Sequence, residues 1–460
     1  MRRGSSNWVL LLLSFLVFHV SLSNEQEDST APMLRAEQEA LYLLIQDLVG
    51  KWWNGSELYP DPCGWTQIQG VSCDVYDGKW HVTGLTFGSI LDDSLECSED
   101  ASLSPLLFEF EHLKSLSFFG CFVSSHHKTS IPSSHWEKLA PSLETLEFRS
   151  NPGLVGEIPA SITRLTKLQS LVLVDNSLSG NLPQELGHLV QLKRLALAGS
   201  HFSGQIPASI GSKLSELLIL DMSRNSLTGS LPSSLGAMNS LLKLDLSDNF
   251  LHGSLPQELG QLKCLTLLDL RGNKFSHGLP QALHDMVSLQ DLLLSNNPLG
   301  GNLMGTDWGR LTNLSTLDLS NTNLSGEIPE SIVRVKRLRF LALDNNNLSG
   351  CVPTKLADLP DLTALYLNGN NLAGELKFSE AFHRRMGRRF AFGGNPHSSV
   401  AQYCKQEKSA GSQGKGKGRI MDDQSSSVLT SLSFPASSIN VWLGVAVQEL
   451  LVVIALILLL

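Results

Sequence analysis

Residues 171–183 read Leu171-Val172-Leu173-Val174-Asp175-Asn176-Ser177-Leu178-Ser179-Gly180-Asn181-Leu182-Pro183, and close copies of this phrase recur from residue 146 to residue 374. The position held here by Asn176 returns at residues 151, 200, 225, 249, 273, 297, 322, 346 and 370, always after 24 or 25 residues. A fixed period of this length indicates a solenoid, in which each repeat forms one coil and packs against its neighbours. We predict an α/β solenoid, a right-handed curved superhelix of about 12 repeats with a cap at each end.

Each position of the phrase has a structural role. The alternation Leu-x-Leu predicts a short strand whose leucines face inward and whose intervening residues line the concave face. The Asn carboxamide can donate to and accept from backbone groups of neighbouring coils, so stacked copies form a hydrogen-bonded ladder. Ser200 and Thr322 replace Asn in two coils, where we expect looser stacking because a hydroxyl is shorter. The Gly supplies backbone freedom for the bend, and the Pro ends the extended piece.

The N-terminus and the composition indicate a secretory protein. Arg2 and Arg3 precede an apolar run and then small residues before Asn24, the pattern of a signal peptide. Seven cysteines fit an oxidising compartment, and their odd number leaves at least one thiol over. A net charge of −9 does not indicate the basic surface that is typical of nucleic-acid binding. N-glycosylation is predicted at the sequons of Asn54, Asn313, Asn323 and Asn347.

Cysteines flank the start of the array. Residues 34–53 have helical periodicity. A bridge between Cys63 and Cys73 would pin this helix over the first coil and hide its apolar edge, as a solenoid cap must. In a later, irregular repeat, Cys121 either fills the buried Asn position or pairs with Cys97, and the sequence leaves both alternatives open.

The array ends in a second amphipathic segment. Phe378, Phe382, Met386 and Phe390 recur at a four-residue interval, with four arginines off this stripe. We expect a C-terminal cap helix whose arginine side is solvated. The domain assignment is 1–23 signal peptide, 24–83 N-terminal cap, 84–376 repeats, 377–404 C-terminal cap, 405–440 flexible linker and 441–460 hydrophobic tail.

The tail has two interpretations. It is either a removable glycolipid-anchor signal, with small residues at 425–427 as the attachment region, or a retained membrane span. Glu449 would lie near the middle of the bilayer, and no Lys or Arg follows the segment, so anchoring is favoured. Both interpretations place the repeats on the extracellular face of the cell membrane.

No constellation for catalysis is present. The sequence shows no kinase signature, phosphate loop or nucleophile elbow, and its His residues lack metal-ligand spacing, so we predict neither an enzyme nor a cofactor. Asp221, Asp245, Asp269 and Asp318 each lie between the two inward apolar residues of a strand and form an acidic column. We expect this column to be solvated on an open face and to serve structure or binding rather than acid–base chemistry.

The concave positions suggest a partner site. Small apolar residues replace polar ones on two adjacent strands, which predicts an exposed apolar patch with an arginine on either side. Ordinary drift at unconstrained positions is the alternative. The candidate ligand-binding residues are Arg149, Val172, Val174, Ala196, Ala198, Arg224, Asp245 and Arg271. The repeat sequence is also interrupted near His277 and Met304. The interruption is explained either by a partner contact or by ordinary loop variation.

The phrase L-x-L-x-x-N-x-L-x-G-x-I/L-P resembles the plant-specific class of extracellular leucine-rich repeats over residues 34–404. This resemblance implies a plant receptor-like protein without a kinase. The segments Trp52-Trp53, Asp61-Pro62-Cys63-Gly64-Trp65 and 378–396 are similar to the Piriformospora indica-insensitive protein 2 group, a membrane-associated type implicated in root responses to a beneficial fungus. Two features depart from the class: the cap cysteines are spaced further apart, and the concave columns lack an Arg-x-Arg pair.

These observations favour a cell-surface recognition protein. Its concave face would bind a peptide, protein or glycan, and it would signal through a kinase-bearing co-receptor in plant–microbe interaction or development. The alternative is an apoplastic inhibitor of microbial cell-wall-degrading enzymes, which the hydrophobic tail disfavours.

Overall fold

The structure is a computed structural model that describes residues 31–88, 95–373, 376 and 378–396. The chain separates into two units, Met1–Cys404 and Lys405–Leu460, and every described residue belongs to the first. The predicted signal peptide, linker and hydrophobic tail, together with Cys404, lie outside the described residues. Within the described ranges, no helix is both long enough and apolar enough to cross a membrane.

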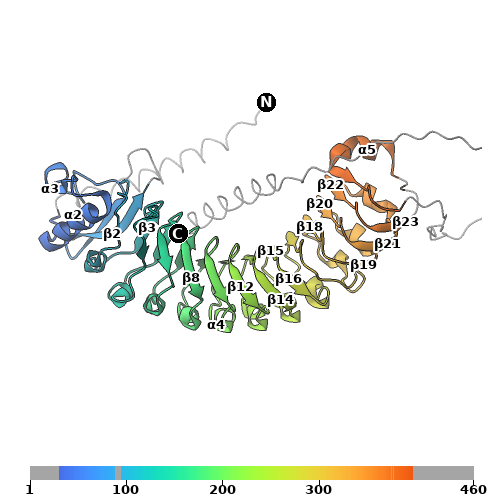
Figure 1. The fold of residues 1–460 in the computed structure, drawn as a ribbon, viewed down its shortest axis with the longest axis horizontal. Coiled ribbons are helices and arrows are strands. Elements are labelled where there is room, and N and C mark those ends of the chain that lie inside the picture. Colours follow the sequence, from blue (N-terminus) through green and yellow to red (C-terminus); the bar gives the residue numbers. More distant parts are fainter. Residues whose placement is uncertain (1–30, 89–94, 374–375, 377, 397–460) are drawn as a thin grey trace, which may run out of the picture. The chain divides into compact units, whose positions relative to one another are not determined.

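The Leu-x-Leu segments form the strands of one long sheet, as the repeat predicts (Figure 1). In the described part of the chain, this sheet has 14 strands in the order β1-β2-β3-β5-β7-β9-β11-β13-β15-β17-β18-β20-β22-β24. Their bounds are β1 Val71–Tyr76, β2 Lys79–Gly88, β3 Ser115–Phe119, β5 Thr145–Arg149, β7 Ser170–Val174, β9 Arg194–Ala196, β11 Ile219–Asp221, β13 Lys243–Asp245, β15 Leu267–Asp269, β17 Asp291–Leu293, β18 Thr316–Asp318, β20 Phe340–Ala342, β22 Ala364–Tyr366 and β24 Phe390–Ala391. Strands β1 and β2 pair antiparallel, and from β2 onward neighbours pair in parallel. Equivalent positions of successive coils therefore form columns along the inner face.

The residues after each Asn form two smaller lateral sheets, with orders β16-β14-β12-β10-β8-β6-β4 and β19-β21-β23. Their bounds are β4 Thr129–Ser130, β6 Leu154–Gly156, β8 Ser177–Asn181, β10 His201–Gly204, β12 Ser226–Gly229, β14 Phe250–Ser254, β16 Lys274–Ser276, β19 Ser325–Glu327, β21 Asn347–Cys351 and β23 Asn371–Ala373. In most coils the repeat Pro then precedes a single-turn helix, and Figure 1 shows one of them, α4, on the outer side of the curved array. These short helices are η2 Pro105–Glu109, η3 Trp136–Leu139, η4 Ala160–Arg164, η5 Gln184–His188, α4 Ala208–Lys213, η6 Ser233–Ala237, η7 Gln257–Gln261, η8 Gln281–Asp285, η9 Trp308–Arg310, η10 Glu330–Arg334 and η11 Thr354–Asp358.

The buried Asn residues form the predicted ladder. The Nδ2 of Asn225 donates to the Leu197 carbonyl in the preceding coil (2.8 Å), and its Oδ1 accepts from the Phe202 amide (3.1 Å). The same two kinds of bond recur at Asn249, Asn273, Asn297, Asn346 and Asn370. Each Asn thus satisfies backbone groups that the curved coil leaves without partners. Ser200 is buried in this row, but its Oγ has no hydrogen-bond partner within the described part of the chain.

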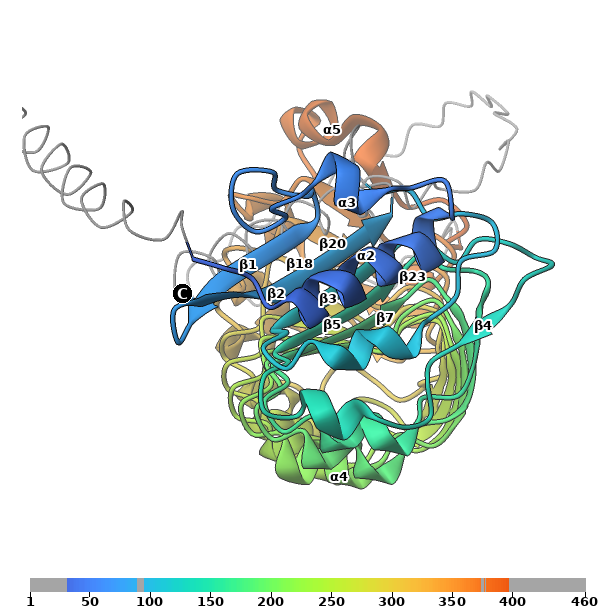
Figure 2. The ribbon, with the colours of Figure 1, turned by 90° about the vertical axis from the view of Figure 1, so that its left-hand side faces the viewer.

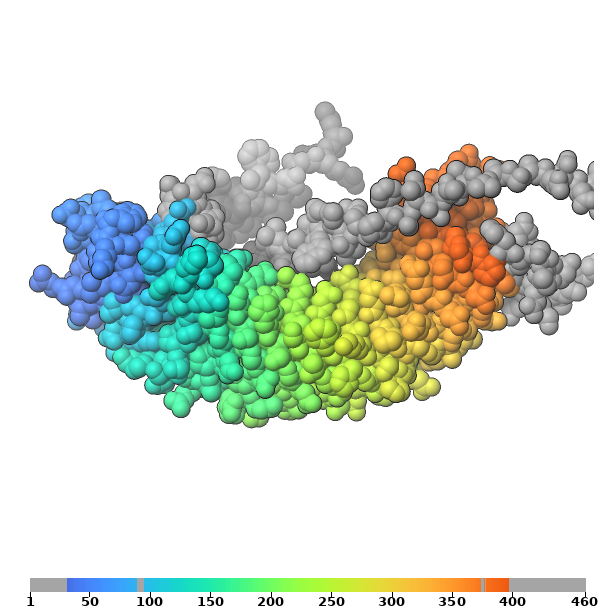
Figure 3. Space-filling view, in the orientation of Figure 1, coloured from blue at the N-terminus to red at the C-terminus, as the bar shows by residue number. Residues whose placement is uncertain are grey.

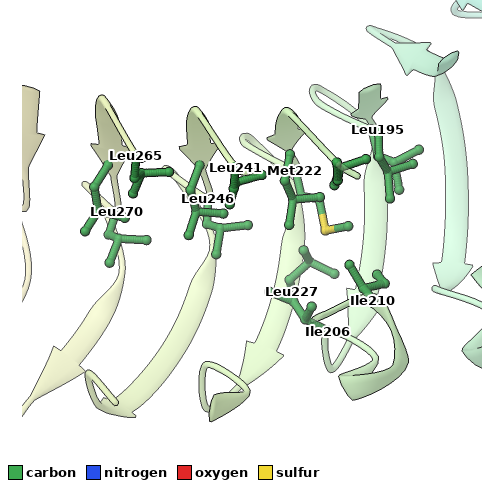
Figure 4. Close-up of a cluster of buried hydrophobic side chains, with 14 of the residues drawn as sticks. Leu195, Ile206, Ile210, Met222, Leu227, Leu241, Leu246, Leu265 and Leu270 are labelled. Atoms are coloured by element: carbon green, nitrogen blue, oxygen red, sulfur yellow. The ribbon is translucent and has the colours of Figure 1, made fainter. Parts of the chain in front are cut away.

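The inward leucines pack into one continuous core. Figure 4 shows this packing between adjacent coils at Leu195, Ile206, Ile210, Met222, Leu227, Leu241, Leu246, Leu265 and Leu270, all of them buried. Successive coils follow one another without a break in the surface of the array (Figure 3). Burying a leucine contributes about 1.5–3 kcal/mol, so the core is the main source of stability. Because each coil contacts chiefly its neighbours, this core extends in one dimension.

Helix α2 (Arg35–Val49), followed by the short α3 (Gly55–Leu58), covers the N-terminal end of the core. Its residues Leu41, Leu44 and Leu48 are buried, and Figure 2 shows α2 lying across the first strands of the sheet. The apolar edge of the first coil is therefore hidden from water.

Disulfides reinforce this cap. The predicted pair Cys63 and Cys73 is bridged, with Cα atoms 5.6 Å apart. A second bridge joins Cys97 to Cys121, with Cα atoms 5.0 Å apart, and Cys121 also fills the buried position, so both alternatives for Cys121 hold. Cys351 is also disulfide-bonded, whereas Cys264 is free and exposed.

The C-terminal cap is shorter than the periodicity predicts. Helix α5 spans Glu380–Met386 and buries Phe382 and Met386. Gly387, with a φ of 51°, ends the helix before the single turn η12 (Gly387–Arg389), and Phe390 then begins β24. The prediction that Phe390 continues the helical stripe is wrong, because the left-handed turn at Gly387 redirects the chain to pair with β22.

The irregular coil predicted near residues 277–304 interrupts the lateral sheet. β16 ends at Ser276, and pairing resumes with β19. His277, Gly300 and Gly301 in this interval adopt left-handed backbone conformations, with φ of 70°, 63° and 76°. Met304 is exposed, while Trp308 is buried beneath the longer excursion.

Candidate ligand-binding surface

Three carboxylates stack on the inner face of the sheet. Parallel pairing places Asp221 opposite Asp245 and Asp245 opposite Asp269. Adjacent strands are about 4.8 Å apart, so each carboxylate lies within reach of the next. Leu293 takes the next position in this column and separates Asp318 from the other three.

Two cations partly neutralise the column. The Nζ of Lys243 lies 3.8 Å from Oδ2 of Asp221. Arg271 donates from Nη2 to Oδ2 of Asp269 (2.6 Å) and from Nε to Oδ1 (2.9 Å). Asp269 is buried beneath this bidentate pair, so the prediction of an open, solvated acidic column is wrong there. Asp245 lies between the two pairs.

The environment of Asp245 favours its neutral form. Burial raises the pKa of this carboxyl first, and the neighbouring carboxylates of Asp221 and Asp269 raise it further, to about 7. The amide and hydroxyl of Ser247 donate to Oδ1 at 3.1 and 2.7 Å, and the hydroxyl bond offsets part of the rise. The centre of the column therefore gains or loses a proton near neutral pH.

The predicted apolar patch lies inside the sheet surface rather than on it. Val172, Ala196 and Ala198 are 0, 2 and 3 % exposed, and Val174 is half-buried, so the prediction of an exposed patch is wrong. The pairing of β7 with its neighbours gives the reason. Val172 lies in register between Glu147 and Ala196, and close neighbouring strands leave little of such short side chains uncovered.

The two flanking arginines are paired with carboxylates. Arg149 Nη2 lies 3.5 Å from Oε1 of Glu147 on its own strand. Arg224 Nη2 lies 3.0 Å from Oδ1 of Asp175. A Cβ on the intervening Gly199 would be 2.2 Å from that Asp175 oxygen and 3.1 Å from the Arg224 nitrogen, so the ion pair uses the space left by the glycine. Charged groups thus lie on either side of the buried apolar residues Val172, Ala196 and Ala198.

An aromatic pair that the sequence prediction did not include lies further along the same face. The rings of Phe340 on β20 and Tyr366 on β22 are 5.7 Å apart between centroids, and both residues are half-buried. Nearby Asp344 has a pKa raised mainly by burial. The sequence shows both aromatic residues at concave strand positions, and this pattern could have identified the pair. The structure therefore extends the candidate surface from Arg149 to Tyr366.

The predicted glycosylation sites differ in accessibility. Asn54, Asn323 and Asn347 are exposed. Asn313 is half-buried, its Nδ2 donates to the Val287 carbonyl (2.9 Å), and its Oδ1 accepts from Nη1 of Arg337 (3.0 Å).

Other parts of the described surface offer less for binding. One open hollow of about 530 Å³ lies beside α2 and η2, and a second of about 620 Å³ lies beside η3 and η4. Neither includes a residue of the charged column. Among described residues, no group of three or more His, Cys, Asp or Glu side chains could hold a metal ion.

Comparison with known proteins agrees with this architecture. Family models described as leucine-rich repeat match residues 309–372 and, separately, 167–189, 216–238, 240–262 and 264–286. Together with the parallel sheet, these matches identify a leucine-rich-repeat solenoid that is similar to those of plant receptor-like proteins.

Among individual relatives, Piriformospora indica-insensitive protein 2 of Arabidopsis thaliana is 55 % identical over 173 residues, covering 37 % of this chain and 40 % of that protein. Receptor like protein 29 of Arabidopsis thaliana is 35 % identical over 181 residues, covering 38 % of this chain and 37 % of that protein. The matches thus cover less than half the length of these relatives.

Solved receptor structures share the fold. The structure of PEPR1 with AtPEP1 is 30 % identical, with a TM-score of 0.60 over 75 % of this chain and 49 % of that one. The Arabidopsis receptor kinase HAESA, in complex with the peptide hormone IDA and the co-receptor SERK1, is 30 % identical, with a TM-score of 0.58 over 74 % of this chain and 59 % of that one.

Proposed function

We propose that this protein recognises a peptide or protein ligand on the inner face of its repeats, at the outer surface of a plant cell. The observation that carries the proposal is the alignment of one charged column and a half-buried aromatic pair on the inner sheet face, from Asp221 to Tyr366. Side chains with directional charge and rigid aromatic surface are those that dominate protein recognition. The HAESA structure, which contains the peptide hormone IDA, supports this class of partner.

The chemistry of the column suggests the character of the ligand. Asp221 and Asp269 each have a cation within 4 Å, whereas burial and these two carboxylates raise the pKa of Asp245 to about 7 against the opposing charge of Lys243. A ligand ammonium or guanidinium placed over Asp245 would lower this pKa and favour the carboxylate. Peptide segments with Lys or Arg beside an aromatic or apolar side chain therefore fit this surface better than acidic ones.

The proposed output is assembly with a kinase-bearing co-receptor, an arrangement supported by the complex of HAESA with IDA and SERK1. A ligand held on the inner face can favour assembly if the partner binds the liganded array more tightly than the empty one. We propose that the tail at 441–460 is the removed signal for a glycolipid that holds the array at the membrane. Release of the protein from intact cells by phosphatidylinositol-specific phospholipase tests a glycolipid anchor.

The ligand site is tested by capture with residues 24–404 from plant cell-surface extracts, followed by hydrogen exchange of the complex. We expect protection on β11 to β22 and loss of capture in the Asp318→Lys, Tyr366→Ala double variant. Glu258→Lys, an exposed outer-side change in η7, is the matched control and should capture normally. Protection confined to the outer helices would contradict the proposal, and a captured microbial wall-degrading enzyme that loses activity would favour the inhibitor alternative.

A further inference from the structure

The N-terminal cap exposes two tryptophans to an equal extent. Trp52 and Trp65 are each 77 % exposed, whereas Trp53 between them in sequence is 4 % exposed. An indole is among the largest apolar surfaces a residue can offer, so an exposed one generally has a contact to make. The two exposed tryptophans differ in one respect, because only Trp52 lies two residues before a sequon asparagine, Asn54.

The local chain leaves Trp52 and Asn54 both exposed, two residues apart. Burial alternates along residues 52–54, which are exposed, buried and exposed in turn. Trp53 turns inward and packs on the ring of Tyr59 at 6.0 Å, so its two neighbours both project to solvent. Trp52 lies in a turn that the Trp53 amide closes by donating to the Gly50 carbonyl (3.1 Å), and two residues of chain span at most about 7 Å, so a sugar on Asn54 starts close to Trp52.

Asn54 also presents its carboxamide in an accessible form. It precedes α3, but its side chain makes no capping hydrogen bond to that helix. The sequon hydroxyl of Ser56 donates to Asn54 Oδ1 (3.0 Å), which leaves the Nδ2 side of the amide toward solvent. The other sequons lack an exposed aromatic at the same offset: buried Leu311 precedes Asn313, and Asn321 and Asn345 precede the other two.

We propose that Asn54 carries an N-glycan whose first N-acetylglucosamine stacks on the indole of Trp52. Attachment forms a bond from Asn54 Nδ2 to the anomeric carbon of the sugar, while a lipid-linked diphosphate leaves and the amide gives up one proton. The axial C–H groups of the sugar then face the electron-rich indole, and the weakly polar ring face covers apolar surface that water otherwise contacts. The glycan becomes part of the N-terminal cap.

The direct test is tryptophan oxidation in the full chain produced by a glycosylating eukaryotic cell, read residue by residue by peptide mass spectrometry. Trp65 is the internal reference, because its exposed fraction equals that of Trp52. In the glycosylated protein we expect Trp52 to oxidise severalfold more slowly than Trp65. Trimming the glycan to its first sugar should preserve the protection, and Asn54→Gln should abolish it.

A stability cycle separates stacking from a structural role of the indole. Trp52→Ala should lower the melting midpoint of the glycosylated protein by about 1–2 °C and leave that of the Asn54→Gln background unchanged. Trp52→Phe should restore most of the effect, and Trp65→Ala should have no dependence on the glycan. Equal oxidation of Trp52 and Trp65 in the glycosylated protein would overturn the proposal, as would an unmodified Asn54.

Discussion

Ser200 shows at the scale of one residue what the Asn ladder contributes. Its hydroxyl is buried and unbonded within the described residues, at a position where Asn225 in the next coil bonds to the backbone of the coil before it. Ser200→Asn should place a carboxamide next to the equivalent groups, the Leu173 carbonyl and the Leu178 amide. We expect the free energy of unfolding to rise by about 1–2 kcal/mol, measured by urea denaturation. The reverse change, Asn225→Ser, should lower it, and a gain equal to that from Ser200→Ala would show that the ladder bonds do not form.

Asp245 should make stability depend on pH. Its pKa is raised from 3.8 to about 7, so between these values the folded protein holds a proton that the unfolded chain releases. The contribution of this proton to the free energy of unfolding is present in acid and is lost as the pH rises through about 7. Asp245→Asn keeps an oxygen that can accept from Ser247 and removes the buried charge. We expect it to stabilise the protein by roughly 1–3 kcal/mol near pH 8 and by much less near pH 4.5. The exposed Asp361→Asn is the control, and an equal gain at both pH values would contradict this account.

The sequence predicts the inward-facing residues more fully than the exposed ones. The period alone identifies which Asn residues form the ladder, because that role depends on spacing along a single chain. The burial of Val172 depends instead on Glu147 and Ala196, its neighbours from two other coils. The pKa of Asp245 likewise depends on carboxylates 24 residues away on either side. Such properties follow from the register of stacked coils and the size of neighbouring side chains, which the repeat pattern does not encode.

At the scale of elements, the Cys97–Cys121 bridge should hold the first irregular coil. It closes a loop with a sequence separation of 24 residues, for which chain entropy predicts about 3 kcal/mol of stabilisation. Replacing both cysteines by serine should speed amide exchange in residues 95–104 and in β3, while exchange in β13 and β15 stays unchanged. Cys264→Ser, at the exposed free thiol, is the matched control and should alter neither region. Unchanged exchange in residues 95–104 would show that packing alone holds the coil.

The C-terminal cap shows that hydrophobic periodicity does not locate the end of a helix. Apolar residues every fourth position predict a helix through Phe390, and they do mark its buried residues Phe382 and Met386. Gly387 adopts a left-handed conformation that the stripe does not reveal, and the chain then pairs as β24 with β22. The end of the helix is thus set by backbone conformation and by the open edge of the last repeat strand.

At the scale of the whole molecule, stability should be distributed along the array rather than held in one centre. Leu244 is fully buried on β13, whose strand partners are β11 and β15. Leu244→Ala should cost about 2–5 kcal/mol, because it removes buried methyl groups and leaves a cavity. In a quasi-one-dimensional solenoid this loss weakens the altered coil and its interfaces with its neighbours. Native-state hydrogen exchange should therefore quicken in β11, β13 and β15 and remain slow in β3 and β22. Glu258→Ala on the exposed outer helix of the same coil should leave all five strands protected. A uniform acceleration from β3 to β22 after Leu244→Ala would instead mean that the repeats open as a single cooperative unit.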